Sequence, residues 1–231
     1  MKQIALDIAL APAPTLEGFA GRLNQEAVQF LAQWCAAGRQ RSPVPVYLWG
    51  EAGSGKTHLL RAARHALQQQ GEPCGWLDAA SPADVPFEGS WRAALMDDVQ
   101  LYATGQQHTA FNWFINAMTP ADGQPPRAVL AAGSLPPTDL PLREDLRSRL
   151  GWGHVFQLHA PTEGECRALL QQAAAQRGLA LGEGVTDYVL TRFSRDMGSL
   201  MRLLERLDRY SLQTRRAVTI PLIKAMLEEG A

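Results

Sequence analysis

Short apolar runs alternate with stretches of helical periodicity along the first two thirds of the chain. Apolar runs of strand length cover residues 46–49, 75–77, 93–96 and 128–132. Between the runs, apolar residues recur at helical spacing over 25–37, 56–70 and 108–118. Asn24 precedes the first of these helices and is expected to cap it. Strands that alternate with helices form a parallel sheet with helices on both faces, so the pattern predicts an α/β fold.

The pattern changes near Ala160-Pro161, and no strand is expected beyond that point. Helical periodicity there covers residues 163–177, 184–194, 197–213 and 220–229. A chain of 231 residues has room for one α/β domain and a small appendage. The predicted parts are therefore an N-terminal tail at 1–11, an α/β domain at 12–160 and a small all-helical domain at 161–231.

The clearest motif is a glycine-rich turn between a predicted strand and a predicted helix. Gly50-Glu51-Ala52-Gly53-Ser54-Gly55-Lys56-Thr57 matches the P-loop pattern G-x-x-x-x-G-K-[ST]. In such a loop, backbone N–H groups and the following helix N-terminus surround phosphate oxygens. Lys56 is expected to bind the β and γ phosphates, and the Thr57 hydroxyl to ligate Mg²⁺. The motif, taken together with His58, predicts a binding site for ADP or ATP with Mg²⁺.

Two acidic residues are expected beside this loop. The apolar run 93–96 ends in Asp97 and Asp98, and the ends of parallel strands meet at one edge of the sheet. Asp97 is predicted to hold Mg²⁺ and its water shell, and Asp98 to orient the attacking water. Because Asp98 is one methylene shorter than the glutamate common in related ATPases, the rate of hydrolysis is left open.

Composition and charge narrow the class of protein. Apolar residues make up 46% of the chain, charged residues 19%, and the net charge is -1, all typical of a globular protein. This charge balance carries no signature of nucleic-acid binding, and no apolar run approaches the ~20 residues of a membrane span. A cytoplasmic protein without a membrane partner is expected. Cys35, Cys74 and Cys166 show neither metal-ligand nor redox spacing, which favours buried thiols.

Three strings resemble the DnaA branch of the AAA+ ATPases. They are the P-loop with Trp49 before it and 58–60 after it, the run 95–100, and Leu146-Arg147-Ser148-Arg149-Leu150-Gly151-Trp152-Gly153. The resemblance implies a AAA+ module, in which a P-loop α/β domain is followed by a helical lid. In that branch the last string carries an arginine that reaches the nucleotide site of a neighbouring subunit. Arg149 occupies that position, which implies a catalytic role in trans.

Within that branch, the chain resembles the Hda group of DnaA regulators. The resemblance implies a protein like them, with the AAA+ module and without the helix-turn-helix domain or the large N-terminal domain of the initiator. Members of the group promote ATP hydrolysis on DnaA and carry an N-terminal peptide for the sliding clamp. Residues 3–8 resemble that peptide, with Gln3 for a polar subsite and Leu6 and Ile8 for an apolar groove. The resemblance implies DnaA and the DNA polymerase sliding clamp as partners.

Two positions bear on nucleotide sensing. Gly198 stands where the family's lid usually places an arginine that contacts the phosphates. Loss of that cation favours an ADP-bound resting state or weak intrinsic hydrolysis, and Arg195 and Arg202 are the nearby substitutes. Ser134 stands about where a polar sensor residue is expected at the end of a strand.

Other functions stay open from the sequence alone. One is a self-contained ATPase that loads a helicase, and another is a nucleotide-stabilised adaptor that stimulates no chemistry. Five arginines crowd the final helices, at positions 202, 206, 209, 215 and 216. Contact with DNA is conceivable there, but Glu205 and Asp208 lie among these arginines and favour a solvated helix face. The oligomeric state, including a homo-oligomer, is equally open.

Overall fold

The computed structural model describes residues 14–19, 21–38, 43–120, 123–193 and 197–229. Backbone contacts divide the chain at Ala160-Pro161 into an α/β unit and a helical unit. Among the described residues, no helix has both the length and the apolar character needed to cross a bilayer.

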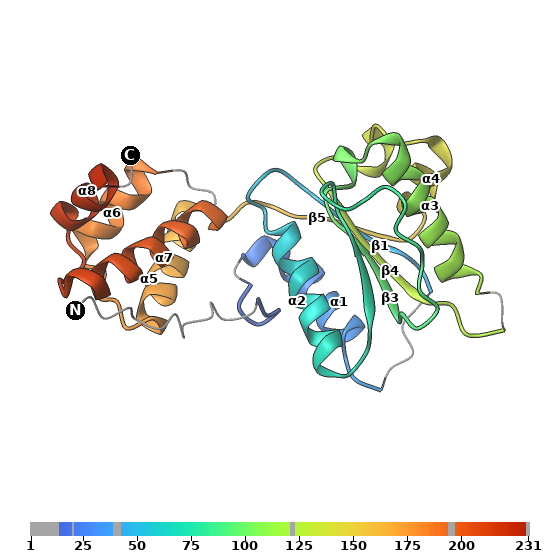
Figure 1. Ribbon diagram of the computed structural model, residues 1–231, viewed down its shortest axis with the longest axis horizontal. Coiled ribbons are helices and arrows are strands. Elements are labelled where there is room, and N and C mark those ends of the chain that lie inside the picture. Colours follow the sequence, from blue (N-terminus) through green and yellow to red (C-terminus); the bar gives the residue numbers. More distant parts are fainter. Residues whose placement is uncertain (1–13, 20, 39–42, 121–122, 194–196, 230–231) are drawn as a thin grey trace. The chain divides into compact units, whose positions relative to one another are not determined.

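Among the described residues, five parallel strands form the centre of the α/β unit (Figure 1). They are β1 (Val46–Trp49), β2 (Cys74–Leu77), β3 (Ala93–Met96), β4 (Ala128–Gly133) and β5 (His154–Gln157), in the order β2-β3-β4-β1-β5. Trp49 of β1 pairs with Gly133 of β4, and Met96 of β3 pairs with Ala131 of β4. The carboxyl ends of β1, β3 and β4 therefore meet at one edge of the sheet, where ligands of open parallel sheets bind.

Helices cover both faces of this sheet (Figure 1). The helical elements of the unit are η1 (Arg22–Asn24), α1 (Gln25–Trp34), α2 (Lys56–Gln69), η2 (Val99–Leu101), α3 (Thr104–Met118), η3 (Pro137–Asp139) and α4 (Glu144–Gly151). Helices α1 and α2 pack on one face, and α3 and α4 pack on the other. The strands and helices expected from the hydrophobic pattern are confirmed to within a few residues at their ends.

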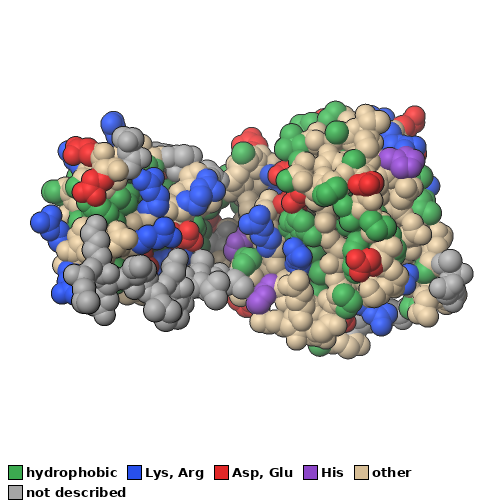
Figure 2. Space-filling view, in the orientation of Figure 1, with side chains coloured by type: hydrophobic (Ala, Val, Ile, Leu, Met, Phe, Trp, Pro, Cys, Tyr) green, Lys and Arg blue, Asp and Glu red, His purple; other side chains and the backbone are tan. Residues whose placement is uncertain are grey.

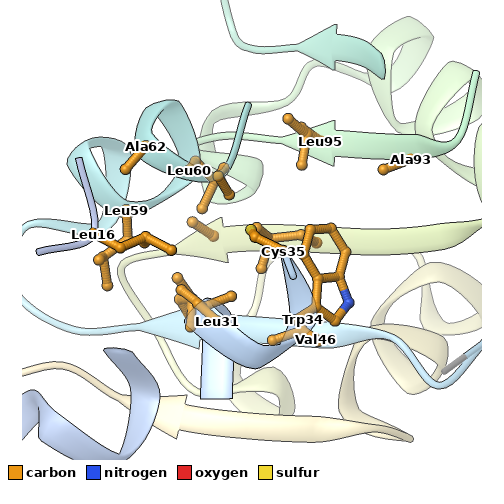
Figure 3. Packing of buried hydrophobic residues seen from close by; sticks show 14 of the residues in the cluster. Leu16, Leu31, Trp34, Cys35, Val46, Leu59, Leu60, Ala62, Ala93 and Leu95 are labelled. Atoms are coloured by element: carbon orange, nitrogen blue, oxygen red, sulfur yellow. The ribbon is translucent and has the colours of Figure 1, made fainter. Parts of the chain in front are cut away.

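Successive residues of β1 point into two separate cores. Val46 and Leu48 belong to the core under α1 and α2, whereas Tyr47 belongs to the core under α3 and α4. Figure 3 shows the first core, in which Leu31 of α1 and Leu60 of α2 meet the strands. Full burial of one such side chain contributes roughly 1.5–3 kcal/mol. A strand buried on both faces explains why 46–49 is apolar without alternation.

The prediction that Asn24 caps α1 is wrong. The Asn24 side chain makes no capping hydrogen bond, although the residue is buried with 2% exposure. Instead, Asn24 Nδ2 donates to His159 O at 2.9 Å, and His159 N donates to Asn24 Oδ1 at 2.9 Å. A buried amide must satisfy both its donor and its acceptor, and the backbone after β5 offers both. Asn24 thus fastens the segment before α1 to the end of β5.

The pattern of apolar residues also missed β5. The strand lies at the edge of the sheet, where it pairs only with β1, and three of its four residues are exposed. An edge strand with polar His154 and Gln157 lacks the apolar run by which buried strands are recognised.

The described residues of the helical unit form four helices with their own core. They are α5 (Glu163–Gln176), α6 (Glu183–Arg192), α7 (Met197–Thr214) and α8 (Ile220–Glu229). Thr162 and Glu165 form a capping box that starts α5, with Glu165 N donating to Thr162 Oγ1 at 3.3 Å. Leu200, Leu204 and Leu207 form a buried stripe along α7.

Candidate nucleotide-binding site

The glycine-rich turn lies between β1 and α2, as its sequence predicts. Gly53 and Gly55 have φ angles of 80° and 92°, in the left-handed region that favours glycine. A Cβ atom at Gly55 would collide with the ring of Phe19. Phe19 therefore packs against the loop backbone itself, and the turn tolerates no side chain at this position.

Lys56 is the first residue of α2, and its side chain folds back into the turn. Its Nζ donates to Gly50 O at 2.8 Å and to Glu51 O at 2.9 Å. Burial lowers the pKa of Lys56, and the carboxylates of Asp98 and Asp97 act in the opposite direction. The ammonium group thus lies within the loop, where it would bind phosphate oxygens that enter among the backbone N–H groups.

Thr57 and Asp97 come together from α2 and the end of β3. The Asp97 carboxylate accepts a hydrogen bond from the side chain of Thr57, and Asp97 is 4% exposed. Burial raises the pKa of Asp97, Asp98 adds to the rise, and the hydrogen bond from Thr57 lowers it. A hydroxyl beside a carboxylate at a P-loop fits the oxygen preference of Mg²⁺, and these two residues would hold the ion.

Asp98 adopts a backbone conformation that is uncommon for residues other than glycine. Its φ and ψ are 49° and 45°, and its Oδ1 accepts a hydrogen bond from Gln100 Nε2 at 3.1 Å. Gln100 Oε1 in turn accepts from Ser134 N at 2.9 Å. Gln100 thus connects the acid after β3 to the residue after β4.

Sequence reasoning missed the role of Gln100. The residue stands in the string that resembles the DnaA branch, but its contact with Ser134 spans 34 positions. Only the 3-10 turn η2 and the packing of β3 beside β4 bring the two residues together. The predicted sensor residue Ser134 makes this contact through its backbone N–H.

His58 lies on the first turn of α2, beside the segment that precedes α1. Its Nε2 lies 3.2 Å from Thr15 O, and its ring lies 5.7 Å from that of Phe19. Burial lowers the pKa of His58, the contact with Thr15 raises it, and Arg61 lowers it. A neutral His58 then donates to Thr15 and closes the N-terminal segment over the start of α2.

Arg149 lies on α4, on the opposite face of the sheet from α2. Its guanidinium carbon lies 5.3 Å from the ring centre of Phe111 and 5.7 Å from that of Phe114. Its Nε is buried without a hydrogen-bond partner among the described residues. By contrast, Arg143 donates to both carboxylate oxygens of Asp145, each at 2.7 Å.

A shallow depression on the surface borders Arg149. Asp145, Ser148, Arg149 and Trp152 line it. Trp152 is 65% exposed, which is unusual for the largest apolar side chain. Because Trp and Arg are enriched among the residues that carry the binding energy of protein interfaces, this depression is a candidate partner-binding surface.

The remaining predicted positions lie elsewhere. Gly198 is in the first turn of α7, and Arg202 donates to Ser199 Oγ at 2.9 Å. Gln3, Leu6, Ile8 and Arg195 lie outside the described residues.

No three His, Cys, Asp or Glu side chains gather into a metal site in the described ranges. On the face shown in Figure 2, acidic side chains lie among the Lys and Arg side chains of the helical unit.

Family models match both parts of the chain. Residues 13–74 match the model of the bacterial DnaA ATPase domain, and residues 163–227 match that of the Hda lid domain. An uncharacterised protein of Haemophilus influenzae is 32% identical over 232 residues, which cover 98% of either chain.

Solved structures share the fold at lower identity. Domain III of Thermotoga maritima DnaA has a TM-score of 0.74 at 21% identity and covers 94% of this chain and 97% of its own. AMPPCP-bound DnaA from Aquifex aeolicus has a TM-score of 0.64 at 22% identity, over 90% of this chain and 71% of that one. A RuvB mutant of Thermotoga maritima has a TM-score of 0.66 at 16% identity, over 93% and 71%. The chain therefore belongs to the DnaA-related AAA+ family, with a DnaA-type ATPase domain followed by an Hda-type lid.

Proposed function

We propose that this protein is a nucleotide-binding regulator of replication initiation that stimulates ATP hydrolysis on the initiator DnaA. The observation that carries the proposal is Arg149, which lines a surface depression and whose Nε has no hydrogen-bond partner among the described residues, in a module with an Hda-type lid. The regulator supplies this arginine to the nucleotide site of DnaA, and the acceleration occurs there.

The regulator's own P-loop binds ADP or ATP with Mg²⁺. Support comes from the left-handed glycines, the inward ammonium of Lys56 and the Thr57–Asp97 pair. A related DnaA of the same fold carries AMPPCP. Gly198 provides no cation where the family's lid arginine would stand, so we expect little hydrolysis by the regulator itself. Bound nucleotide then serves mainly to stabilise the module.

Arg149 suits action in trans because no ion pair or hydrogen bond among the described residues occupies its side chain. A paired arginine such as Arg143 would have to break a bidentate contact before it could reach a phosphate. Arg149 has no such contact among the described residues. Arginine stays charged and presents a planar fork to phosphate oxygens, which is the property required of a finger residue.

The decisive experiment measures ATP hydrolysis on purified DnaA, with and without this protein and DNA-loaded clamp. We expect stimulation that requires the regulator and increases when clamp is present. Robust hydrolysis by the regulator alone would instead favour a self-contained ATPase such as a helicase loader. Binding to DnaA without any change in hydrolysis would favour an adaptor.

We also propose that residues 3–8 of the N-terminal tail tether the protein to the sliding clamp. Replacement of Gln3 and Leu6 by alanine is expected to abolish retention of the regulator on immobilised clamp, because the peptide would lose its polar and apolar contacts. Nucleotide binding should not change, since the P-loop lies in the folded module. Clamp retention equal to that of the parent protein would contradict this assignment, and Glu17→Ala provides a control outside the peptide.

A further inference from the structure

Two arginines of α4 and its N-cap share one aromatic ring of α3. The guanidinium carbons of Arg143 and Arg149 lie 4.9 Å and 5.3 Å from the ring centre of Phe111. Phe111 is half-buried and packs against the core formed under α3 and α4. The face of an aromatic ring attracts cations through its quadrupole, so one side chain holds two guanidinium groups.

The two arginines differ in what else binds them. Asp145 neutralises Arg143 through two hydrogen bonds of 2.7 Å. Arg149 makes no ion pair or side-chain hydrogen bond among the described residues, and its Nε is buried. The neutral Arg143–Asp145 pair allows a second cation to approach the same ring, because repulsion between the two guanidinium groups is reduced.

A hydrogen bond joins the N-cap of α4 to α3 beside this ring. Arg143 N donates to Gln107 Oε1 of α3 at 2.9 Å. Phe114, which is 1% exposed, supplies a second ring 5.7 Å from Arg149. The start of α4 is therefore held against α3, and Arg149 extends over two rings of fixed position.

We propose that Phe111 is a positioning residue for Arg149. Its ring holds the guanidinium in one orientation while leaving the terminal N–H donors available to a phosphoryl group on the partner ATPase. An ion pair would also restrain the side chain, but it would occupy those donors and cancel the charge. This inference rests on the proposed function, since it assigns a role to Phe111 only if Arg149 acts in trans.

The test compares Phe111→Leu with Phe111→Tyr in the assay of DnaA hydrolysis. Leucine keeps an apolar side chain but removes the ring face, so we expect the maximal stimulated rate to fall about tenfold to a hundredfold. The regulator concentration that gives half-maximal stimulation should change little, because the contact surface is retained. Tyrosine keeps the ring and should restore most of the rate.

Phe87→Leu is the matched control. Phe87 is also half-buried in this core, and Arg127 lies 5.6 Å from its ring centre. Its replacement should cost similar stability without affecting the stimulated rate. Thermal melting of each variant shows whether it folds, and Phe111→Met replaces Phe111→Leu if the latter does not.

The outcomes separate this inference from the proposed function. If Arg149→Ala stimulates hydrolysis normally, Arg149 does not act in trans, so that part of the proposed function fails and the inference fails with it. If Arg149→Ala is inactive while folded Phe111→Leu or Phe111→Met keeps the parent rate, only the inference is overturned. A higher half-maximal concentration at an unchanged maximal rate would also overturn it, because Phe111 would then be a contact residue. In the Arg149→Ala background, Phe111→Leu should have no further effect.

Discussion

Replacement of Arg149 by alanine is expected to abolish stimulation of ATP hydrolysis on DnaA. If Arg149 acts as an arginine finger, that is, an arginine that one protein inserts into the nucleotide site of another, the loss is roughly a thousandfold or more. Negative charge spreads over the γ-phosphoryl oxygens and the leaving oxygen as the bond breaks. A guanidinium inserted from a second protein stabilises that state more than the ground state. The measurement is the rate of phosphate release from DnaA at saturating regulator.

The same substitution should leave the module otherwise intact. Arg149 makes ring contacts but no ion pair within the described chain, so its loss is expected to cost about 1 kcal/mol or less of unfolding free energy. Nucleotide binding and clamp binding should match the parent. Arg147→Ala removes the same charge from the same helix and serves as the control. Arg149→Lys keeps the charge without the planar fork and should rescue poorly.

A folded, clamp-competent Arg149→Ala protein that still stimulates hydrolysis at the parent rate would rule out the finger mechanism. In that case the protein would stimulate hydrolysis without supplying Arg149, and the depression lined by Arg149 and Trp152 would serve to bind DnaA and not to take part in the chemistry.

Replacement of Lys56 by alanine is expected to remove the thermal stabilisation that ADP or ATP gives to the parent protein. A ligand that binds only the native state at a hundred times its Kd stabilises it by about 2.7 kcal/mol. For a chain of this size, each 1 kcal/mol corresponds to a shift of about 2–4 °C in Tm. The variant should melt at the same temperature with and without nucleotide, and calorimetric titration should show the loss of affinity directly.

The structure explains why Lys56 should matter for the ligand more than for the fold. Its ammonium group contacts carbonyl oxygens of the loop, and burial lowers the pKa of Lys56. The charged form of Lys56 is therefore less favourable in the loop than in water, and a bound phosphate would offset this difference. Lys224→Ala, at an exposed position of α8, is the control for loss of a lysine. Equal melting of the parent protein with and without ADP would contradict nucleotide binding at this loop.

Local patterns in the sequence were sufficient to predict the P-loop turn and most of the helices and strands, but not the edge strand β5. Hydrophobic spacing predicted β1 at 46–49 and β3 at 93–96, and the glycine pattern predicted the turn between β1 and α2. Parallel pairing then places Asp97 at the edge of the sheet near Thr57. Each of these features depends on residues close together in the chain, or on the rule that parallel strands end at one edge.

Contacts between distant residues could be decided only by the tertiary structure. Asn24 stands before a helix, where asparagine commonly caps, yet its amide bonds the backbone of His159, 135 positions away. Gln100 and Ser134 meet because β3 and β4 are neighbours, and Phe111 meets Arg149 because α4 packs on α3. Sequence alone predicted most of the segments that fold and the motif that is expected to bind phosphate, since spacing along the chain encodes both. The sequence does not reveal which group bonds the buried amide of Asn24 or which ring contacts Arg149. These groups come together only when the helices and the sheet have packed.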